Sequence, residues 1–231
     1  MNKLKLIIFD LDGTAADTME GIVEALNRTM TECGYPTHTR ESVLKFVNYH
    51  TRRYIEEALP EEARTDAEID RVLALYGKHY ADTYLLTTPY EGMPALLAEL
   101  KERGYLLAMN SNKQDAFVKP LAEQLFPSTD GTATFIAAEG YRPDRPSKPD
   151  PSMALTIMAL ASEKLGETIT PDECAYVGDS DVDYLTAVNA GMHPINVSWG
   201  YRSHEFLTAL GDQPVAATMA ELRSILLAPD A

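Results

Sequence analysis

Short apolar runs alternate with segments of helical spacing along most of the chain. Five continuous apolar runs are bounded by turn residues and cover residues 4–9, 105–110, 133–138, 174–178 and 194–199. Such runs are typical of strands buried on both faces, as in a parallel sheet. Between the runs, apolar residues recur at three- and four-residue steps over 93–103, 114–125, 152–165 and 181–190. This spacing predicts helices, and the alternation predicts an α/β fold with a doubly wound parallel sheet.

The long interval from residue 17 to residue 88 does not follow this alternation. It contains no strand candidate, and its apolar residues have helical spacing over 19–33, 41–47, 51–59 and 67–86. A crossover between parallel strands needs one helix, so four helices exceed what the sheet requires. We therefore predict a core domain formed by residues 1–16 and 89–231, and a helical domain formed by residues 17–88. The Pro and Gly at positions 89 and 92 mark the return to the core.

Composition and charge narrow the classes of function. The chain has 231 residues, of which 45% are hydrophobic, and its formal net charge is -15. A negative field of this size argues against binding nucleic acid or anionic lipid. The two cysteines, Cys33 and Cys174, lie far apart without metal-ligand spacing, so neither a disulfide framework nor a zinc site is expected. No apolar run approaches the ~20 residues that span a bilayer, and no signal-peptide pattern is present. We expect a cytoplasmic protein with a small-molecule partner; the sequence leaves its oligomeric state open.

Polar side chains follow the predicted strands where each strand ends. They are Asp10 and Asp12 after 4–9; Ser111, Asn112 and Lys113 after 105–110; Lys148 in the proline-rich loop before 174–178; and Asp179, Asp181 and Asp183 after 174–178. Ligands of an open parallel sheet bind beyond the carboxyl ends of its strands. We therefore expect these side chains to meet at one edge of the sheet.

Carboxylates that converge on one edge repel each other unless a cation neutralises them. Every ligand offered is oxygen, which selects a hard ion, and a few carboxylates with waters suit Mg²⁺ better than a calcium cage. A calcium loop starting at Asp179 would need Gly and Glu where Tyr184 and Ala190 stand. Asp179 and Asp183 are four residues apart at a predicted helix start, so they face the same way. Taken alone, that segment is equally typical of acids that cap a helix.

A cation and a hydroxyl group accompany the acidic cluster. Lys148 and Ser111, beside a carboxylate site neutralised by a metal, favour an anion with several oxygens, of which phosphate is the obvious one. Hydrolysis of a phosphate monoester is very slow without a catalyst, and enzymes accelerate it by up to roughly 10²¹-fold. A carboxylate nucleophile, a metal, a lysine and a separate acid together are suited to that task.

In this order, these residues resemble the four motifs of the haloacid dehalogenase superfamily, most closely its phosphatases of the phosphoglycolate phosphatase type. DLDGT at 10–14 is similar to the first motif, Ser111 to the second, Lys148 to the third and GDSDVD at 178–183 to the fourth. The resemblance implies a Rossmann-like core, and the helical segment falls where that family carries a cap domain. It therefore implies a phosphoric monoester hydrolase.

The resemblance also implies roles for the acids. Asp10 would attack phosphorus and form an aspartyl phosphate, while Asp12 would protonate the leaving alcohol and later activate water. Mg²⁺ would be held by the carboxylates of Asp10 and Asp179 and by the backbone carbonyl of Asp12, with Asp183 reaching it directly or through water. Gly13 would permit the turn. An acid at position 12 indicates transfer from a phosphate ester, since a halide leaves without a proton.

The remaining residues of the motifs would bind the phosphoryl group. By the same resemblance, Ser111 and the backbone amide of Asn112 would contact its oxygens, Lys148 would offset its charge, and Thr14 would brace the loop. The expected substrate is a small phosphorylated metabolite, phosphoglycolate-like or a sugar phosphate. Two alternatives stay open, namely a phosphomutase of the same superfamily and a receiver-like signalling module.

One stretch of the helical segment departs from the family. Relatives commonly carry a Gly-rich turn where this chain has Asn48, Tyr49 and His50. We expect that turn to influence specificity. His50, Arg52 and Arg53 are candidates to meet a substrate carboxylate or a second phosphate, and the alternative is a solvated helix end.

Overall fold

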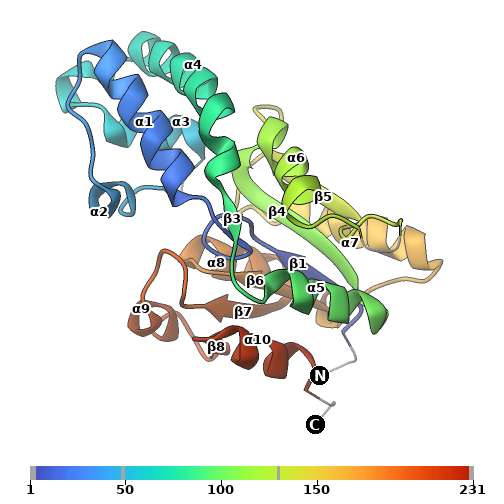
Figure 1. Ribbon diagram of the computed structural model, residues 1–231. Coiled ribbons are helices and arrows are strands. Elements are labelled where there is room, and N and C mark those ends of the chain that lie inside the picture. Colours follow the sequence, from blue (N-terminus) through green and yellow to red (C-terminus); the bar gives the residue numbers. More distant parts are fainter. Residues whose placement is uncertain (1–3, 48–49, 129–130, 229–231) are drawn as a thin grey trace.

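The computed structural model describes residues 4–47, 50–128 and 131–228, and its centre is a parallel sheet (Figure 1). The six strands lie in the order β5 (Ala137–Tyr141), β4 (Leu106–Gln114), β1 (Leu6–Phe9), β6 (Cys174–Gly178), β7 (His193–Val197) and β8 (Val215–Ala216). The central strand β1 pairs with β4 and β6, so that Ile8 faces Ala108 on one side and Tyr176 on the other. All pairings within this six-stranded sheet are parallel, which confirms the predicted α/β class.

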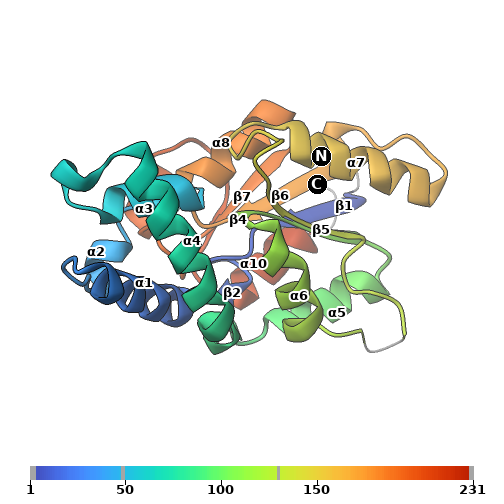
Figure 2. The same ribbon diagram turned by 90° about the horizontal axis from the view of Figure 1, so that it is seen from above.

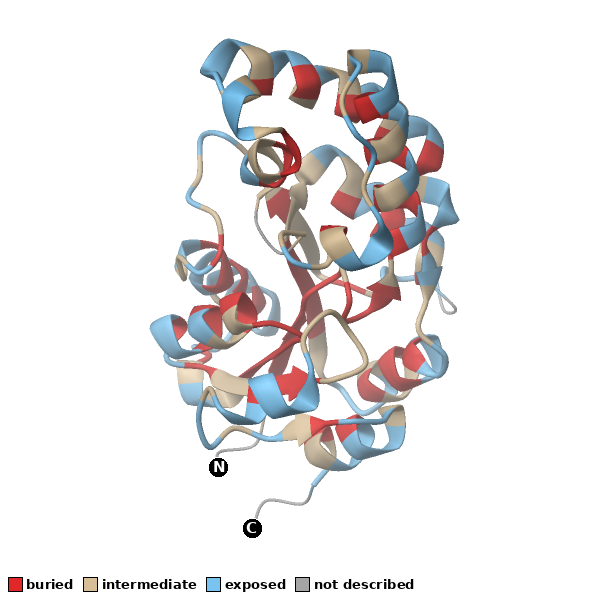
Figure 3. Cartoon of the chain, turned by 90° about the vertical axis from the view of Figure 1, so that its left-hand side faces the viewer, coloured by how far each residue is buried: buried red, intermediate tan, exposed pale blue. Residues whose placement is uncertain are grey.

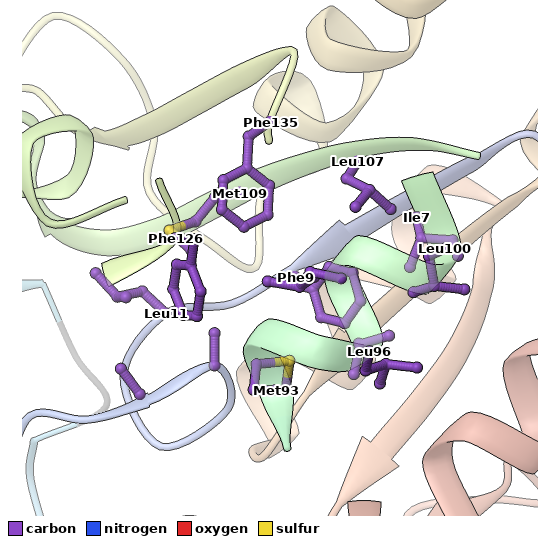
Figure 4. Packing of buried hydrophobic residues seen from close by; sticks show 14 of the residues in the cluster. Ile7, Phe9, Leu11, Met93, Leu96, Leu100, Leu107, Met109, Phe126 and Phe135 are labelled. Atoms are coloured by element: carbon purple, nitrogen blue, oxygen red, sulfur yellow. The ribbon is translucent and has the colours of Figure 1, made fainter. Parts of the chain in front are cut away.

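Both faces of the sheet are covered by helices, which explains the continuous apolar run in β1. Ile7 and Phe9 belong to a core packed under α5 (Met93–Glu102), α6 (Asp115–Leu125) and α10 (Met219–Leu226), as Figure 4 shows in part. Leu6 and Ile8 point to the opposite core, under α7 (Ser152–Leu165) and α8 (Asp181–Ala190). Seen from above, the two helix groups lie on opposite sides of the sheet (Figure 2). The short helices η3 (Pro171–Glu173) and α9 (His204–Thr208) complete this part.

Four helices form an insertion after β1, as the sequence predicts. They are α1 (Met19–Cys33), α2 (Arg40–Val43), α3 (Thr51–Ala58) and α4 (Asp66–Thr83), with the 3₁₀ turns η1 (Glu61–Ala63) and η2 (Tyr84–Leu86). Their buried residues make a hydrophobic cluster of their own. The upper part of Figure 3 marks the buried positions along these helices in red. Two antiparallel strands, β2 (Ala16–Asp17) and β3 (Thr88–Pro89), connect the insertion to the sheet. None of the described helices is long and apolar enough to cross a membrane.

The structure corrects several predicted elements. The strand predicted at 133–138 is wrong in position, because β5 covers Ala137–Tyr141 and Phe135 before it packs into the core. Strand β4 continues through the polar residues to Gln114 with an irregular register after Asn110, so the predicted strand end at 110 is also wrong. Helix α2 ends at Val43 and turns follow it, whereas the predicted helix continued to residue 47. The short elements β2, β3, β8, α9 and α10 were not foreseen.

Candidate active site

Three carboxylates meet where β1 and β6 end. Asp10 directly follows β1, Asp179 directly follows β6, and Asp183 lies in the first turn of α8. Each is buried, and each offers one oxygen that lies within 4.8 Å of those of the other two. Because β1 and β6 are parallel neighbours, their carboxyl ends bring together acids that are about 170 positions apart. The structure thus brings these three predicted residues into one cluster.

The loop after β1 is shaped around Asp179. Gly13 has a φ of 81°, and a Cβ there would lie 2.5 Å from Oδ2 of Asp179, so both the conformation and the space require glycine. Thr14 donates a hydrogen bond from Oγ1 to Oδ1 of Asp179 at 3.0 Å. The backbone amide of Tyr201 donates to Oδ2 at 2.6 Å. Asp179 is therefore oriented from two sides, and Thr14 braces the loop as expected.

Lys148 lies between two of the carboxylates. Its Nζ is 2.8 Å from Oδ1 of Asp10 and 2.6 Å from Oδ1 of Asp183, and only 4% of its side chain is exposed. The side-chain oxygen of Asn112 accepts a hydrogen bond from the backbone amide of Lys148, while the Asn112 amide donates to the Lys148 carbonyl. Ser180 donates from Oγ to Oδ2 of Asp183 at 2.6 Å. Asn112 thus fixes the loop that carries the lysine.

The single ammonium of Lys148 does not balance the charge of the three carboxylates in this cluster. Burial, opposed by Lys148 and reinforced by Asp183, raises the pKa of Asp10 to about 7. Burial likewise raises the pKa of Asp179, with Asp183 and Asp10 acting in the same direction. Burial lowers the pKa of Lys148, but attraction to Asp10 and Asp183 outweighs it, so that this pKa lies above its ordinary value. Three buried carboxylates, two of them paired with the Lys148 ammonium, are a donor set that fits a hard divalent cation.

The second acid of the DLDGT motif has different surroundings. Oδ1 of Asp12 accepts hydrogen bonds from Oγ1 of Thr18 at 2.5 Å and from Nζ of Lys113 at 2.7 Å, and Oδ2 accepts from Ser111 at 3.2 Å. The Thr18 hydroxyl also pairs with the hydroxyl of Tyr201 at 2.8 Å. Asp12 is therefore held by neutral donors and one ammonium, and its carboxylate lies outside the group of three acids.

A cavity joins this region to the helical insertion. Its walls include the predicted residues Asp10, Asp12, Ser111, Asn112 and Lys148. The insertion contributes Ile22, Val47, Thr51, Tyr54, Tyr76 and Tyr80, and the sheet domain adds Lys113, Gln114, Phe117, Ser180 and Val182. About 60 Å³ of the cavity is free for the centres of water-sized molecules, within a hollow of about 620 Å³ that includes its open mouth.

Sequence reasoning missed several residues of this site. Lys113 was noted after its strand without a role, because a lysine at a strand end is as often exposed. Its burial depends on the insertion, whose Tyr80 ring lies 4.7 Å from the Lys113 nitrogen. Thr18 and Tyr201 are 183 positions apart, so no local pattern could have paired them. The tyrosines at 54, 76 and 80 have the helical spacing of ordinary core residues.

The residues of the helical insertion that were candidates for binding a substrate anion contact other parts of the protein instead. Arg52 pairs with Asp66 at 2.8 Å and with Asp70 at 3.2 Å on the surface of the insertion, and Arg53 lies 4.0 Å from Glu57. Neither arginine lines the cavity, so for both the structure favours a solvated helix end. The His50 ring stacks on the Tyr141 ring, with centroids 5.3 Å apart, which joins the insertion to the end of β5. The two preceding candidates, Asn48 and Tyr49, lie outside the described residues.

The raised pKa of Asp10 predicts a pH effect on the metal-free protein. An acid whose pKa is higher in the folded state than in the unfolded state binds more protons when folded. Its contribution to the free energy of unfolding therefore falls as pH rises from about 4 to about 7. Denaturant titrations with a chelator at pH 5 and pH 7.5 measure this effect. From the lower to the higher pH, the free energy of unfolding of the wild type should fall by at least about 1 kcal/mol relative to that of Asp10→Asn, whose amide does not titrate. A pH-independent difference between the two proteins would contradict this.

Comparison with known proteins agrees with these motifs. A family model described as haloacid dehalogenase-like hydrolase matches residues 7–197. The chain is 30% identical over 201 residues to a phosphoglycolate phosphatase of Pseudomonas putida, covering 85% of this chain and 70% of that protein. It is 32% identical over 199 residues to the phosphoglycolate phosphatase of Mesorhizobium japonicum, covering 85% and 83% respectively. A crystal structure from Lactobacillus delbrueckii subsp. bulgaricus superposes with a TM-score of 0.86 at 32% identity, covering 98% of this chain and 100% of that one.

Proposed function

The chain belongs to the haloacid dehalogenase-like hydrolases, and on that premise we propose that it is an Mg²⁺-dependent phosphatase that hydrolyses a small phosphate monoester through an aspartyl phosphate. The observation that carries the proposal is the contrast between the two acids of DLDGT. Asp10 lies in a buried carboxylate cluster beside Lys148, and Asp12 is held apart by its own donors in the same cavity. Family membership sets aside the receiver-like module, which is a protein of another class.

Asp10 would be the nucleophile. Its carboxylate oxygen forms a bond to phosphorus while the bond from phosphorus to the leaving oxygen breaks, and Asp12 gives that oxygen its proton. In the second half, Asp12 takes a proton from water as the water oxygen attacks phosphorus. The bond between Asp10 and phosphorus then breaks, which releases phosphate and restores both acids. The two steps need one acid that stays on the cluster and one that exchanges a proton.

The other residues would bind the phosphoryl group and the metal. Ser111 and the backbone amide of Asn112 would donate to the phosphoryl oxygens, and Lys148 would offset their charge. Asp10, Asp179 and Asp183 with the backbone carbonyl of Asp12 would hold Mg²⁺. When bound, the ion would neutralise the carboxylate cluster and the charge that develops on the phosphoryl oxygens.

The helical insertion would act as a cap over the site. We place the cap at residues 17–88 and the core at residues 1–16 and 89–231, so the paired strands β2 and β3 would form the hinge, near 15–18 and 86–91. Two observations support this: the insertion has its own hydrophobic cluster, and its tyrosines form one wall of the cavity. Closure would exclude bulk water during the first step.

Removal of the metal gives the direct test of the proposed function. With Mg²⁺, the protein should release inorganic phosphate from p-nitrophenyl phosphate and from 2-phosphoglycolate. A chelator should lower turnover by roughly 100-fold or more, and added Mg²⁺ should restore it. Saturating Mg²⁺ should also raise the melting temperature, because an ion at 100 times its Kd stabilises the folded state by about 2.7 kcal/mol.

Two outcomes would decide against this function. Turnover that persists in the chelator would refute the proposed metal site. Transfer of the phosphoryl group to a second sugar hydroxyl, without release of stoichiometric phosphate, would favour the phosphomutase alternative.

A further inference from the structure

The segment 198–202 follows β7 and lies outside the four motifs, yet it packs against the first of them. The indole nitrogen of Trp199 donates a hydrogen bond to the backbone carbonyl of Thr14 at 3.1 Å. A Cβ at Gly200 would lie 2.3 Å from the backbone oxygen of Gly13, so a side chain there would displace that loop. The sequence SWGYR is thus docked closely on the loop that carries both acids of DLDGT.

Tyr201 is the residue of this segment that reaches the active site through two different groups. Its backbone amide donates to Oδ2 of Asp179 at 2.6 Å, and its hydroxyl lies 2.8 Å from Oγ1 of Thr18. The Thr18 hydroxyl in turn donates to Oδ1 of Asp12 at 2.5 Å. Tyr201 therefore connects a carboxylate of the buried cluster with the acid that exchanges a proton in the proposed mechanism.

The direction of the two hydroxyl bonds follows from the number of hydrogens. A threonine hydroxyl has one hydrogen, and an ionised carboxylate can only accept. When Thr18 gives its hydrogen to Asp12, the Tyr201 hydroxyl must supply the hydrogen of the other bond. Tyr201 thus fixes the rotation of the Thr18 hydroxyl, so that its hydrogen stays directed at Asp12.

The Thr18 hydroxyl has no competing task in its own helix. Thr18 is the N-cap of α1, where a threonine side chain ordinarily accepts a hydrogen bond from a backbone amide of the first turn. Among the described residues none donates such a cap bond to Thr18, whereas the N-cap residues Thr39, Thr65 and Thr218 each accept one. The Thr18 hydroxyl serves Asp12 instead.

The two oxygens of Asp12 consequently have different surroundings. Oδ1 accepts from Thr18 and from Nζ of Lys113 at 2.7 Å, whereas Oδ2 accepts from Ser111 at 3.2 Å. Because Thr18 keeps its hydrogen on Oδ1, the oxygen left to exchange a proton with a leaving group is Oδ2. That oxygen lies beside the hydroxyl that is proposed to bind the phosphoryl group.

We propose that Tyr201 is a positioning residue for the proton transfer by Asp12, and that it acts through the Thr18 hydroxyl. This rests on the proposed function, in which Asp12 protonates the leaving oxygen, and adds to it a residue outside the four motifs. Without the Tyr201 hydroxyl, Thr18 can rotate its hydrogen away from Oδ1. The carboxyl group of Asp12 then loses a donor and its fixed orientation.

The test compares leaving groups that differ in their need for a proton. p-Nitrophenolate leaves phosphorus without one, whereas the alkoxide of 2-phosphoglycolate or ethyl phosphate needs a general acid. Single turnovers with excess enzyme and Mg²⁺ measure the first step for p-nitrophenyl phosphate and for the alkyl ester that the wild type cleaves faster. Tyr201→Phe keeps the ring and the amide that holds Asp179. It should slow departure of the alkoxide about tenfold, and departure of p-nitrophenolate less than about twofold.

Variants of Thr18 test the route from Tyr201 to Asp12. Thr18→Val removes the hydroxyl and should slow the alkyl ester at least as much as Tyr201→Phe does, while Thr18→Ser keeps the hydroxyl and should stay within about threefold of the wild type. Combining Thr18→Val with Tyr201→Phe should be no slower than Thr18→Val alone, because residues that act through one contact are not additive. Tyr105→Phe, which removes a hydroxyl before β4 at the opposite end of the sheet, is the matched control and should change neither rate.

The outcomes separate this proposal from the proposed function. Equal slowing of both leaving groups in Tyr201→Phe would show a general disturbance of the loop and would overturn the positioning role, while leaving a phosphatase. A Tyr201→Phe enzyme as fast as the wild type with both esters, or additive effects in the double variant, would overturn it as well. If the wild type with Mg²⁺ cleaved none of these esters, the proposed function would fail, and the positioning role with it.

Discussion

Asp10→Asn should reduce kcat by roughly 10⁴-fold or more, because an amide cannot form the bond to phosphorus that the carboxylate forms. The fold should persist, since asparagine has nearly the same shape and removes one charge from a cluster of three buried carboxylates. Release of inorganic phosphate from p-nitrophenyl phosphate and from 2-phosphoglycolate measures the effect. Circular dichroism and the melting temperature in a chelator should show a protein at least as stable as the wild type.

A matched control lies two residues before Asp183, the acid that α8 contributes to the cluster. Asp181 is also in the first turn of α8, but it is paired with Arg202 at 3.4 Å and does not belong to the carboxylate cluster. Asp181→Asn should keep kcat within about threefold of the wild type, as expected for a partly exposed polar side chain. Substantial turnover by Asp10→Asn, with Asp181→Asn unaffected, would remove Asp10 from the role of nucleophile.

Lys148→Met should damage both activity and stability. The ammonium lies 2.8 Å from Asp10 and 2.6 Å from Asp183 with 4% of its side chain exposed. Breaking a buried ion pair from one side costs about 3–5 kcal/mol, because the other charge stays buried without a partner. We expect the metal-free variant to lose stability of that order and kcat to fall roughly 10³-fold, since the charge on the nucleophile and the phosphoryl group is no longer offset.

Denaturant titrations with chelator and with Mg²⁺ measure the loss of stability. The loss should be larger without the metal, because Mg²⁺ supplies positive charge to the same carboxylates. Lys164→Met, an exposed lysine near the end of α7, is the control and should change stability by no more than about 0.5 kcal/mol. Equal stability of Lys148→Met and the wild type in the chelator would mean that the lysine does not compensate the negative charge of the carboxylate cluster.

The parts of the site that sequence could predict are those fixed by the sheet. A parallel sheet aligns the ends of its strands, so acids that follow two buried runs meet whatever lies between them in the chain. Asp10 and Asp179 follow the apolar runs of β1 and β6, which were visible because helices cover both faces. The helical insertion could be predicted equally well, since four segments with helical spacing exceed the one helix of a crossover between parallel strands.

The parts that sequence could not predict depend on tertiary packing. Strand β5 is an edge strand that includes Glu139 and Gly140, so it does not form an apolar run, while the apolar Phe135 before it packs into the core without a strand. The burial of Lys113 depends on how the insertion closes over the sheet, and the contact between Thr18 and Tyr201 joins distant segments. Of these features, the burial of Lys113 bears on the cavity, because this residue forms part of its wall.

If Asp10 carries the phosphoryl group during turnover, rapid acid quenching followed by peptide mass spectrometry will detect the group on that residue. Enzyme mixed with Mg²⁺ and 2-phosphoglycolate or p-nitrophenyl phosphate should yield a peptide from the region of residues 7–18 that is heavier by one phosphoryl group, with the label on Asp10. The label should be absent from Asp10→Asn. A phosphoryl group on any other residue, or complete hydrolysis in a single turnover with no labelled peptide at any quench time, would contradict the mechanism.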